Sequence, residues 1–320
     1  MMKFLLAPLL ALAMASPAAA AAPLHVIFDT DMGNDVDDAL ALAMLHAFAS
    51  RGELKLLAVT VSKDNPWAAE YVRMVDEYYG RPTIPVGIVH DGKTQEDGLY
   101  VKQVCELHGR HPSQAAVADA VQLLRQTLAA EPDGAVTVIQ VGFSTNLARL
   151  MESQPDRYSA LNGMELVKKK VRLLTVMAGN FAQSKPEYNV STDVPAAQKV
   201  FTGWPTEIYF SGFEVGLAVV YPASSIEHDF PAGNPVAEAY RVYAKMPYDR
   251  PTWDLTAVLY DLRPDRGYFD VSEPGDVTVA ANGATAFHAN PQAKRYFLKV
   301  NPIQAARVQE ACVWLASQPK

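Results

Sequence analysis

Short apolar runs alternate with helix-favouring segments along most of this chain. The apolar runs fall at residues 24–28, 54–61, 136–141 and 171–177, and the helix-favouring segments fall at residues 39–49, 68–79, 115–129, 195–201, 235–244 and 302–316. Strands that alternate with helices typically form a parallel sheet that is covered on both faces. The sequence therefore predicts an α/β fold in which helices flank a mostly parallel central sheet.

The composition favours a single domain without a polymeric partner. No linker, low-complexity tract or internal repeat divides residues 23–320, so these residues are expected to form one domain. The chain has 28 Lys and Arg residues against 35 Asp and Glu residues, and its formal net charge is −7. Such a balance lacks the basic surface that binds nucleic-acid polymers, so a nucleic acid is not the expected partner.

The first 22 residues have the pattern of a cleaved secretory signal peptide. Lys3 precedes an apolar run at residues 4–14, and small residues with Ala-x-Ala spacing follow it. The run is too short to span a bilayer, so no membrane anchor is expected. The pattern predicts a secreted or periplasmic protein. In that compartment Cys105 and Cys312 could form one disulfide, and neither has a sequence setting that indicates catalysis.

Polar clusters follow the predicted strands at the place where parallel sheets bind ligands. They fall at residues 29–38, 62–65, 142–146 and 178–189. Ligands of parallel α/β sheets bind beyond the carboxyl ends of the strands, where these loops gather. The clusters therefore predict one shared site at that edge of the sheet.

The cluster after the first strand holds five aspartates: Asp29, Asp31, Asp35, Asp37 and Asp38. Their mutual repulsion is offset if a hard cation such as Ca²⁺, which takes carboxylate oxygens, binds among them. A helix cap accounts for one or two of them. An EF-hand needs Gly and Glu where this loop has Asn34 and Leu40. A phosphoryl-transfer site with a nucleophilic aspartate stays as an alternative, although the chain has no phosphate-cradling glycine loop.

This acidic segment resembles the opening motif of a known family, the calcium-dependent nucleoside hydrolases of the inosine-uridine-preferring superfamily. The family motif is Asp-x-Asp-Pro-Gly-x-Asp-Asp, and its counterpart here starts at Asp29 and ends at Asp38. Two departures are visible: Met32 replaces the proline, and two extra residues fall around residues 34–36. The resemblance implies a Rossmann-like single-domain fold.

Later segments resemble the same family in the same order. The matching segments are Gly142-Phe143-Ser144-Thr145-Asn146, Met177-Ala178-Gly179, Asn180, Glu187-Tyr188-Asn189 and Trp253-Asp254. A less complete match falls at Asn65, because the preceding Ser62-Lys63-Asp64 does not reproduce the usual Gly-Asn. The resemblance thus extends over most of residues 23–320.

The resemblance implies a reaction and a role for each matching residue. The reaction is hydrolysis of the N-glycosidic bond of a ribonucleoside to ribose and free base, by a calcium-bound water that Asp31 activates as base. The implied Ca²⁺ ligands are Asp31, Asp38, Asp254 and the Thr145 carbonyl. The implied substrate-binding residues are Asp37 or Asp35, Asn65, Met177, Asn180, Glu187, Asn189 and Trp253.

Trp253 carries the implied base preference. Many family members have His before the last metal aspartate and use it as the acid for the leaving base, whereas purine-specific members have Trp. The resemblance therefore implies a purine preference, with Tyr100 or Trp67 as a second stacking partner. His90, His108 and His111 are expected on the surface or a lid, although histidine titrates near neutrality and one of them could supply the missing acid.

Two functions from different classes stay open on the sequence alone. One is the ribonucleoside hydrolase, and the other is a calcium-dependent nucleoside- or sugar-binding protein without hydrolytic activity. Asp31 favours the enzyme, because a binding protein has no need of a water-activating carboxylate. The expected partner is a small nucleoside substrate, and a homo-oligomer, either a dimer or a tetramer, is expected.

Overall fold

The computed structural model describes residues 22–112 and 117–319. The strands of its main sheet are β1 (Leu24–Thr30), β2 (Leu54–Lys63), β3 (Val86–Lys93), β4 (Ala118–Asp119), β5 (Val136–Gln140), β6 (Val171–Met177), β7 (Glu207–Ser211), β10 (Asp270–Val271), β11 (Gly275–Val279), β12 (Thr285–Ala289) and β13 (Arg295–Lys299). Within the described residues these eleven strands are ordered β12-β11-β13-β7-β6-β5-β1-β2-β3-β4, and β10 pairs with β13. A separate antiparallel pair joins β8 (Val220–Tyr221) and β9 (Arg250–Pro251).

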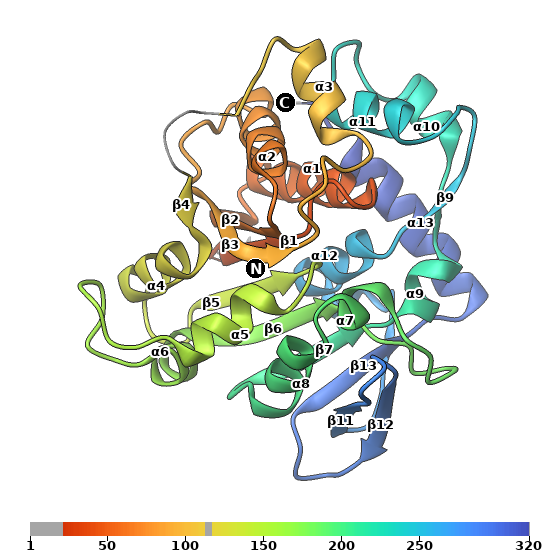
Figure 1. Cartoon of the computed structure of the whole chain (residues 1–320). Helices are drawn as coiled ribbons and strands as arrows, with labels where there is room; N and C mark the ends of the chain where they lie inside the picture. Colours follow the sequence, from red (N-terminus) through yellow and green to blue (C-terminus); the bar gives the residue numbers. More distant parts are fainter. Residues whose placement is uncertain (1–21, 113–116, 320) are drawn as a thin grey trace, which may run out of the picture.

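The centre of the sheet is parallel, which confirms the predicted fold class. Strand β1 lies between β2 and β5, and the parallel pairing continues through β6 and β7 to β13. The antiparallel strands β11 and β12 lie at one edge (Figure 1). The strand pattern did not predict these two strands, because each has only five residues and neither contains a continuous apolar run like those of the central strands.

Helices cover both faces of the sheet (Figure 1). One apolar cluster is formed with α1 (Asp37–Ser50), α2 (Pro66–Tyr78), α3 (Val101–Leu107), α10 (Ala223–His228), α11 (Pro235–Tyr243), α12 (Asp254–Leu262) and α13 (Pro302–Ala316). A second cluster is formed with α4 (Ala120–Ala130), α5 (Thr145–Glu152), α6 (Gly163–Lys170) and α8 (Val194–Gly203). The short elements α7 (Tyr188–Thr192), α9 (Phe213–Ala218) and η1 (Pro264–Arg266) complete the described helices.

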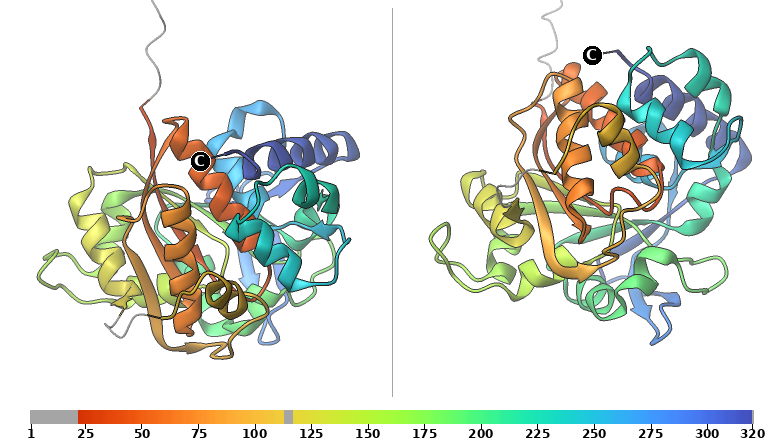
Figure 2. Two further views of the ribbon diagram at one scale, coloured as in Figure 1. Left: turned by 90° about the horizontal axis from the view of Figure 1, so that it is seen from above. Right: turned by 45° about the horizontal axis from the view of Figure 1, so that its top comes forward.

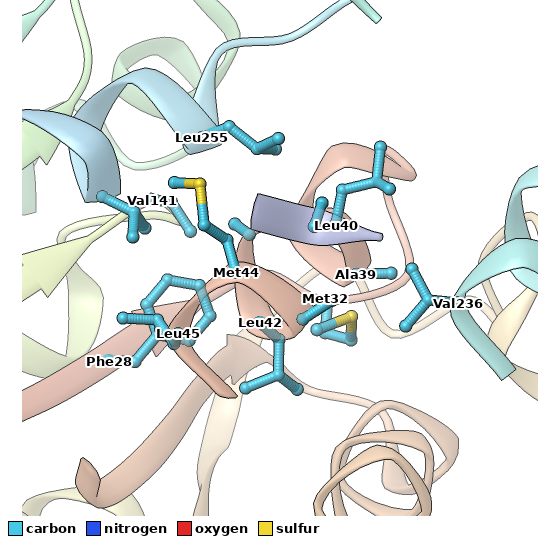
Figure 3. Close-up of a cluster of buried hydrophobic side chains, with 14 of the residues drawn as sticks. Phe28, Met32, Ala39, Leu40, Leu42, Met44, Leu45, Val141, Val236 and Leu255 are labelled. Carbon is cyan, nitrogen blue, oxygen red and sulfur yellow. The ribbon is translucent and has the colours of Figure 1, made fainter. Parts of the chain in front are cut away.

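Helix α1 is buried on all sides, and this fixes the position of the acidic loop before it. Its residues are buried from Asp37 to Phe48, as expected for a helix that is apolar around its whole circumference. It packs against α12 and α13, and α1 and α13 lie side by side in both views of Figure 2. Met44 of α1, Phe28 of β1 and Leu255 of α12 meet in one apolar cluster (Figure 3). Burial of each such side chain contributes about 1.5–3 kcal/mol, so the loop stands on a rigid support.

The expected signal peptide lies outside the described residues, apart from its last residue. No helix in the described part of the chain is long and apolar enough to span a membrane. Cys105 and Cys312 are both buried and free, so they do not form a disulfide in this structure.

Candidate active site

A cavity of about 800 Å³ opens at the carboxyl ends of β1, β5 and β6. Most of the residues that the sequence assigned to the site line it: Asp31, Asp35, Asp37, Asp38, Met177, Asn180, Glu187, Asn189, Trp253 and Asp254. Asn65 and Thr145 are not among the lining residues. The cavity has the volume and the strand-end position typical of small-molecule sites in α/β sheets.

Asp29 holds the acidic loop to the neighbouring strands. Its Oδ1 atom accepts hydrogen bonds from Thr60 Oγ1 at 2.6 Å and from Asn146 Nδ2 at 2.7 Å. Complete burial raises the pKa of Asp29 to about 7, although these hydrogen bonds lower it. The next residue, Thr30, donates from its hydroxyl to Asp38. The hydrogen bonds of Asp29 and Thr30 thus fix the start of the acidic loop.

Asp31 is held by a short chain of polar contacts that ends at a buried lysine. Asn34 Nδ2 donates to Asp31 Oδ2 at 2.8 Å, and Lys63 Nζ donates to Asn34 Oδ1 at 2.8 Å. Burial raises the pKa of Asp31 to about 6, and Asn34 and Lys63 oppose this rise. Gly142 packs so closely that a Cβ atom there would lie 2.5 Å from the Asp31 backbone nitrogen. The segment after β5 therefore requires glycine at this position.

Asp37 joins the acidic loop to the start of α12. Its Oδ2 atom accepts from the backbone N–H groups of Trp253 at 2.7 Å and Asp254 at 3.2 Å. These are N–H groups of the first turn of α12, which have no partner inside the helix. Burial, followed by repulsion from Asp35, raises the pKa of Asp37 to about 8. Two segments more than 200 residues apart are thereby fixed against each other.

Asp37, Asp38 and Asp254 form a group that could hold a metal ion. All three are buried, and one carboxylate oxygen from each lies within 4.8 Å of the others. Burial raises the pKa of Asp38 and of Asp254 well above the usual value, and repulsion from neighbouring aspartates raises both further. A divalent cation offsets this repulsion, and its preferred ligands are carboxylate oxygens, so the residues present fit such an ion. Asp31 lines the same cavity and adds to the repulsion.

Asn65 and Thr145 have structural contacts outside the lining of the cavity. Asn65 caps the N-terminus of α2, where its side chain accepts from the backbone N–H of Trp67 at 2.9 Å. Its amide also donates to the carbonyl of Gln95 at 3.0 Å. Thr145 begins α5, and its hydroxyl donates to Asp193 at 2.6 Å.

The wall that follows β6 is made of side chains that are tied to the backbone. Glu187 caps α7 and accepts from the backbone N–H groups of Asn189 at 2.9 Å and of Gly179 and Val190 at 3.2 Å. Burial raises the pKa of Glu187 to about 7 despite these bonds. Asn189 donates to the carbonyls of Val141 at 2.7 Å and Met177 at 3.1 Å, which links the ends of β5 and β6. The wall is therefore rigid and presents polar groups to the cavity.

Trp253 forms an aromatic wall with Phe213, and Arg250 lies over its ring. The two aromatic rings are stacked at 5.7 Å, and the indole N–H donates to the Phe213 carbonyl at 2.9 Å. The guanidinium carbon of Arg250 lies 5.6 Å from the centre of the Trp253 ring. Arg250 pairs with both carboxylate oxygens of Asp35, and its Nε lies 2.9 Å from Asp35 Oδ1. The acidic loop thus places a fixed cation beside the aromatic wall.

The expected second stacking partners lie elsewhere. Tyr100 is buried beneath the acidic loop, where its hydroxyl donates to the Asp35 carbonyl at 3.0 Å and accepts from the Gly33 N–H at 3.1 Å. Trp67 packs edge-on against His111. Neither aromatic residue lines the cavity.

The three histidines that were expected on the surface or a lid are also absent from the cavity lining: His90, His108 and His111. His108 pairs instead with Glu238 on α11, at 2.5 Å. None of the three is therefore placed to protonate a leaving base in this structure.

Sequence reasoning missed Asn34, Lys63, Phe213 and Arg250. Asn34 and Lys63 lay next to recognised motif residues, but their partners could not be read from the sequence. Arg250 was visible only as a cation three residues before Trp253. Its partner Asp35 is 215 positions away, so only the fold shows the pair.

Comparisons with known proteins agree with this site. The model of the inosine-uridine preferring nucleoside hydrolase family matches residues 26–309. A pyrimidine-specific ribonucleoside hydrolase, RihA from Salmonella enteritidis, is 30% identical over 236 residues, which are 67% of this chain and 68% of the relative.

Solved structures share the fold at lower identity. The inosine-uridine preferring nucleoside hydrolase from Bacillus anthracis has a TM-score of 0.68 at 19% identity, over 92% of this chain and 99% of the other. The purine-preferring ribonucleoside hydrolase from Gardnerella vaginalis has a TM-score of 0.68 at 18% identity, with the same coverage.

The parallel sheet, with an aspartate-rich cavity at its strand ends, has the architecture of the nucleoside hydrolases. The chain belongs to the inosine-uridine preferring nucleoside hydrolase family.

Proposed function

We propose that this protein hydrolyses the N-glycosidic bond of ribonucleosides, with Asp31 as the base and Ca²⁺ as the cofactor. One observation carries the proposal: Asp31 lines the same cavity as the group formed by Asp37, Asp38 and Asp254. The group offers a place for a cation, and Asp31 offers a carboxylate whose position is fixed by Asn34. A divalent cation bound there supplies Lewis-acid chemistry that lowers the pKa of water.

In the proposed reaction, Asp31 accepts a proton from the attacking water. The water oxygen forms a bond to the anomeric carbon of the ribose, while the bond from that carbon to the base nitrogen breaks and its electron pair leaves with the base. The departing base takes up a proton from solvent, and Asp31 releases the proton that it accepted to solvent. Positive charge develops on the sugar as this bond breaks. The neighbouring acidic side chain of Glu187 stabilises that charge and faces the ribose hydroxyls together with Asn180 and Asn189, while Asp37 contributes to the group that would hold the cation.

Arg250 stabilises the leaving base in this proposal. Nε and Nη2 of Arg250 pair with Asp35, and Nη1 has no partner among the described residues. A guanidinium group keeps its proton near neutral pH, so Arg250 acts as a charged hydrogen-bond donor and not as a proton source. The role of Asp35 is then to orient Arg250.

The aromatic wall supports the proposed purine preference. Trp253 and Phe213 both line the cavity, and stacking on an aromatic side chain favours a base with the larger ring system. The named relatives include both a pyrimidine-specific and a purine-preferring enzyme, so direct measurement decides this point.

Export and self-association extend the proposal. The signal-peptide pattern at residues 1–22 supports a secreted or periplasmic protein that acts on extracellular nucleosides, which is consistent with a role in purine salvage. We also expect a homo-oligomer, and sedimentation of the purified mature chain would measure its size.

The activity is tested with purified protein and five nucleosides: inosine, adenosine, guanosine, uridine and cytidine. The expected result is release of reducing sugar, fastest from the purines, with activity lost after chelation and restored by Ca²⁺. Absence of sugar release from all five substrates in the presence of Ca²⁺ would overturn the enzyme proposal. Nucleoside binding without release would instead identify the protein as a nucleoside-binding protein.

Trp253→Ala is expected to reduce kcat/KM for purine nucleosides by about tenfold, and for pyrimidine nucleosides by less, because an aromatic pair contributes about 0.5–1.5 kcal/mol. The assay compares inosine with uridine for each variant. Trp204→Ala is unsuitable as a control because Trp204 is buried. Trp314→Ala, on the surface of α13, is the matched control and should change neither value. Equal losses for inosine and uridine in Trp253→Ala would contradict the stacking role.

A further inference from the structure

A second cavity, of about 400 Å³, lies away from the candidate active site. It is bordered by the end of α1, the segment from α12 to Tyr268, and the outer face of α13. Four arginines line it: Arg51, Arg263, Arg266 and Arg307. We propose that this cavity binds a small phosphate monoester that carries a flat ring, of the size of a nucleoside monophosphate.

The charge of the cavity points to an anion. Two carboxylates lie among the four guanidinium groups, Glu310 in the lining and Glu53 behind it. Glu53 is shared, because it pairs with both Arg51 and Arg263. Two positive charges therefore remain in excess, on a chain whose formal net charge is −7.

Arg266 and Arg307 supply this excess. Arg266 has no ion-pair partner in the described part of the chain. Among the described residues Arg307 donates to two backbone carbonyls and to no side chain, at 3.0 Å to the carbonyl of Arg266 and at 3.2 Å to that of Gly267. Glu310 lines the same cavity, but neither of these two arginines forms an ion pair with a carboxylate among the described residues. Guanidinium groups match the geometry of phosphate oxygens.

Aromatic rings hold the guanidinium groups in place. Arg51 lies 4.7 Å from the centre of the Trp314 ring, and Arg307 lies 5.3 Å from that of Tyr268. Arg263 lies over Phe48 at 4.8 Å. Because these groups are already positioned, less side-chain entropy is lost when an anion binds.

Helix capping explains only part of this arrangement. Arg51 and Arg263 directly follow the C-terminal ends of α1 and α12, where a positive charge offsets the helix dipole. Arg307 lies inside α13, in its first two turns, so the same account does not apply to it. Its contacts with the Arg266 and Gly267 carbonyls and with the Tyr268 ring instead hold the segment after α12 against α13, and this fixes the guanidinium group at the edge of the cavity.

The size and lining of the cavity select the class of ligand. Small-molecule sites usually occupy about 300–1,000 Å³, and a nucleoside monophosphate lies at the lower end of this range. Trp314 is 51% exposed, so its indole offers surface for a flat ring. The phosphate group would meet Arg266 and Arg307, and the ring would meet Trp314 and Tyr268.

Calorimetric titration with adenosine 5′-monophosphate tests the proposal on the purified mature chain. We expect saturable binding to the unaltered protein. The double variant Arg266→Gln with Arg307→Gln should bind at least about tenfold more weakly, because it removes both charged donors that would bond to the phosphate. Both arginines are on the surface and make no contact with the active-site cavity, so the variant should fold and its nucleoside hydrolysis should be unchanged.

Arg157→Gln is the matched control, because Arg157 is also exposed and also lies over a tyrosine ring, at 4.7 Å from that of Tyr158. This variant removes one positive charge elsewhere on the surface and should bind the nucleotide as the unaltered protein does. Equal affinity in the double variant and the unaltered protein would overturn the proposal and would assign the bound nucleotide to the active-site cavity. Absence of binding to the unaltered protein at millimolar nucleotide would also overturn it. Binding is measured without hydrolysis, so this result is independent of the proposed activity.

Discussion

Replacement of Asp31 by asparagine is expected to lower kcat for nucleoside hydrolysis by about 10²–10⁴-fold, the usual contribution of a general base. Asparagine has nearly the same shape but cannot accept the proton of the attacking water. Asn34 would still have a carbonyl oxygen to bond to, so the geometry of the loop is retained. Steady-state kinetics with the best substrate of the five-nucleoside panel measures the effect.

The same variant should fold at least as stably as the unaltered protein in the absence of metal. Asp31 contributes to the repulsion that raises the pKa of Asp38 and of Asp254, and the substitution removes that repulsion. Thermal unfolding in chelator therefore separates a catalytic loss from a folding defect. Asp229→Asn, on the surface, is the control and should alter neither kcat nor the melting temperature. Unchanged turnover in Asp31→Asn would remove Asp31 as the base.

The central sheet and the acidic loop were predictable because their signals are local. An apolar run such as residues 24–28 reports a buried strand by itself, and the structure shows β1 there. The aspartates from Asp29 to Asp38 are close in sequence, so their position at the carboxyl end of β1 can be predicted once that strand is recognised. Helix α13 was also predictable, since Pro302 follows a capping asparagine and an apolar pattern then continues.

The contacts that shape the cavity were not predictable in this way. Asp37 caps α12, and Asp35 pairs with Arg250, across more than 200 residues of sequence. The sequence shows the charge of each residue but not the partner that the fold brings to it. Lys63 is a further case, because a lysine at a strand end is usually solvated, yet here its side chain is fully buried. Its ammonium group pairs with Glu96 at 3.1 Å and donates to Asn34, a residue of the enlarged loop for which the family pattern gave no assignment.

The enlarged loop has a physical role that the sequence left open. Asn34 connects Asp31 to Lys63, and Asp35 holds Arg250 beside Trp253. One short segment thereby supports both the proposed base and the proposed leaving-group contact. Because the two contacts come from adjacent residues, a change in the loop would be transmitted to both ends of the cavity.

Arg250→Ala is expected to lower kcat by about 10²-fold or more, the usual cost of removing one donor that stabilises developing charge. The loss of kcat should be greatest for substrates whose base is the poorest leaving group, since these substrates depend most on stabilisation by the guanidinium. Arg250→Lys should recover little activity, because lysine keeps the charge but cannot pair with two oxygens of Asp35 and donate to the base as well. Steady-state kinetics with inosine and with an activated nitrophenyl riboside separates stabilisation of the leaving base from support of the fold of the site. The activated leaving group departs without stabilisation by Arg250, so only a structural role of Arg250 would slow its release.

A double variant of Asp35 and Arg250 tests the role of Asp35 more sharply than either single variant. If Asp35 acts only by orienting Arg250, then Asp35→Ala should reduce kcat less than Arg250→Ala, and the double variant should be no slower than Arg250→Ala alone. Arg241→Ala is the control, because Arg241 donates to the Ile226 carbonyl and does not line the cavity. Additive losses would show that Asp35 acts independently of Arg250, for example on a ribose hydroxyl. A large loss with the nitrophenyl riboside in Arg250→Ala would instead show that Arg250 supports the fold of the site and not the leaving base.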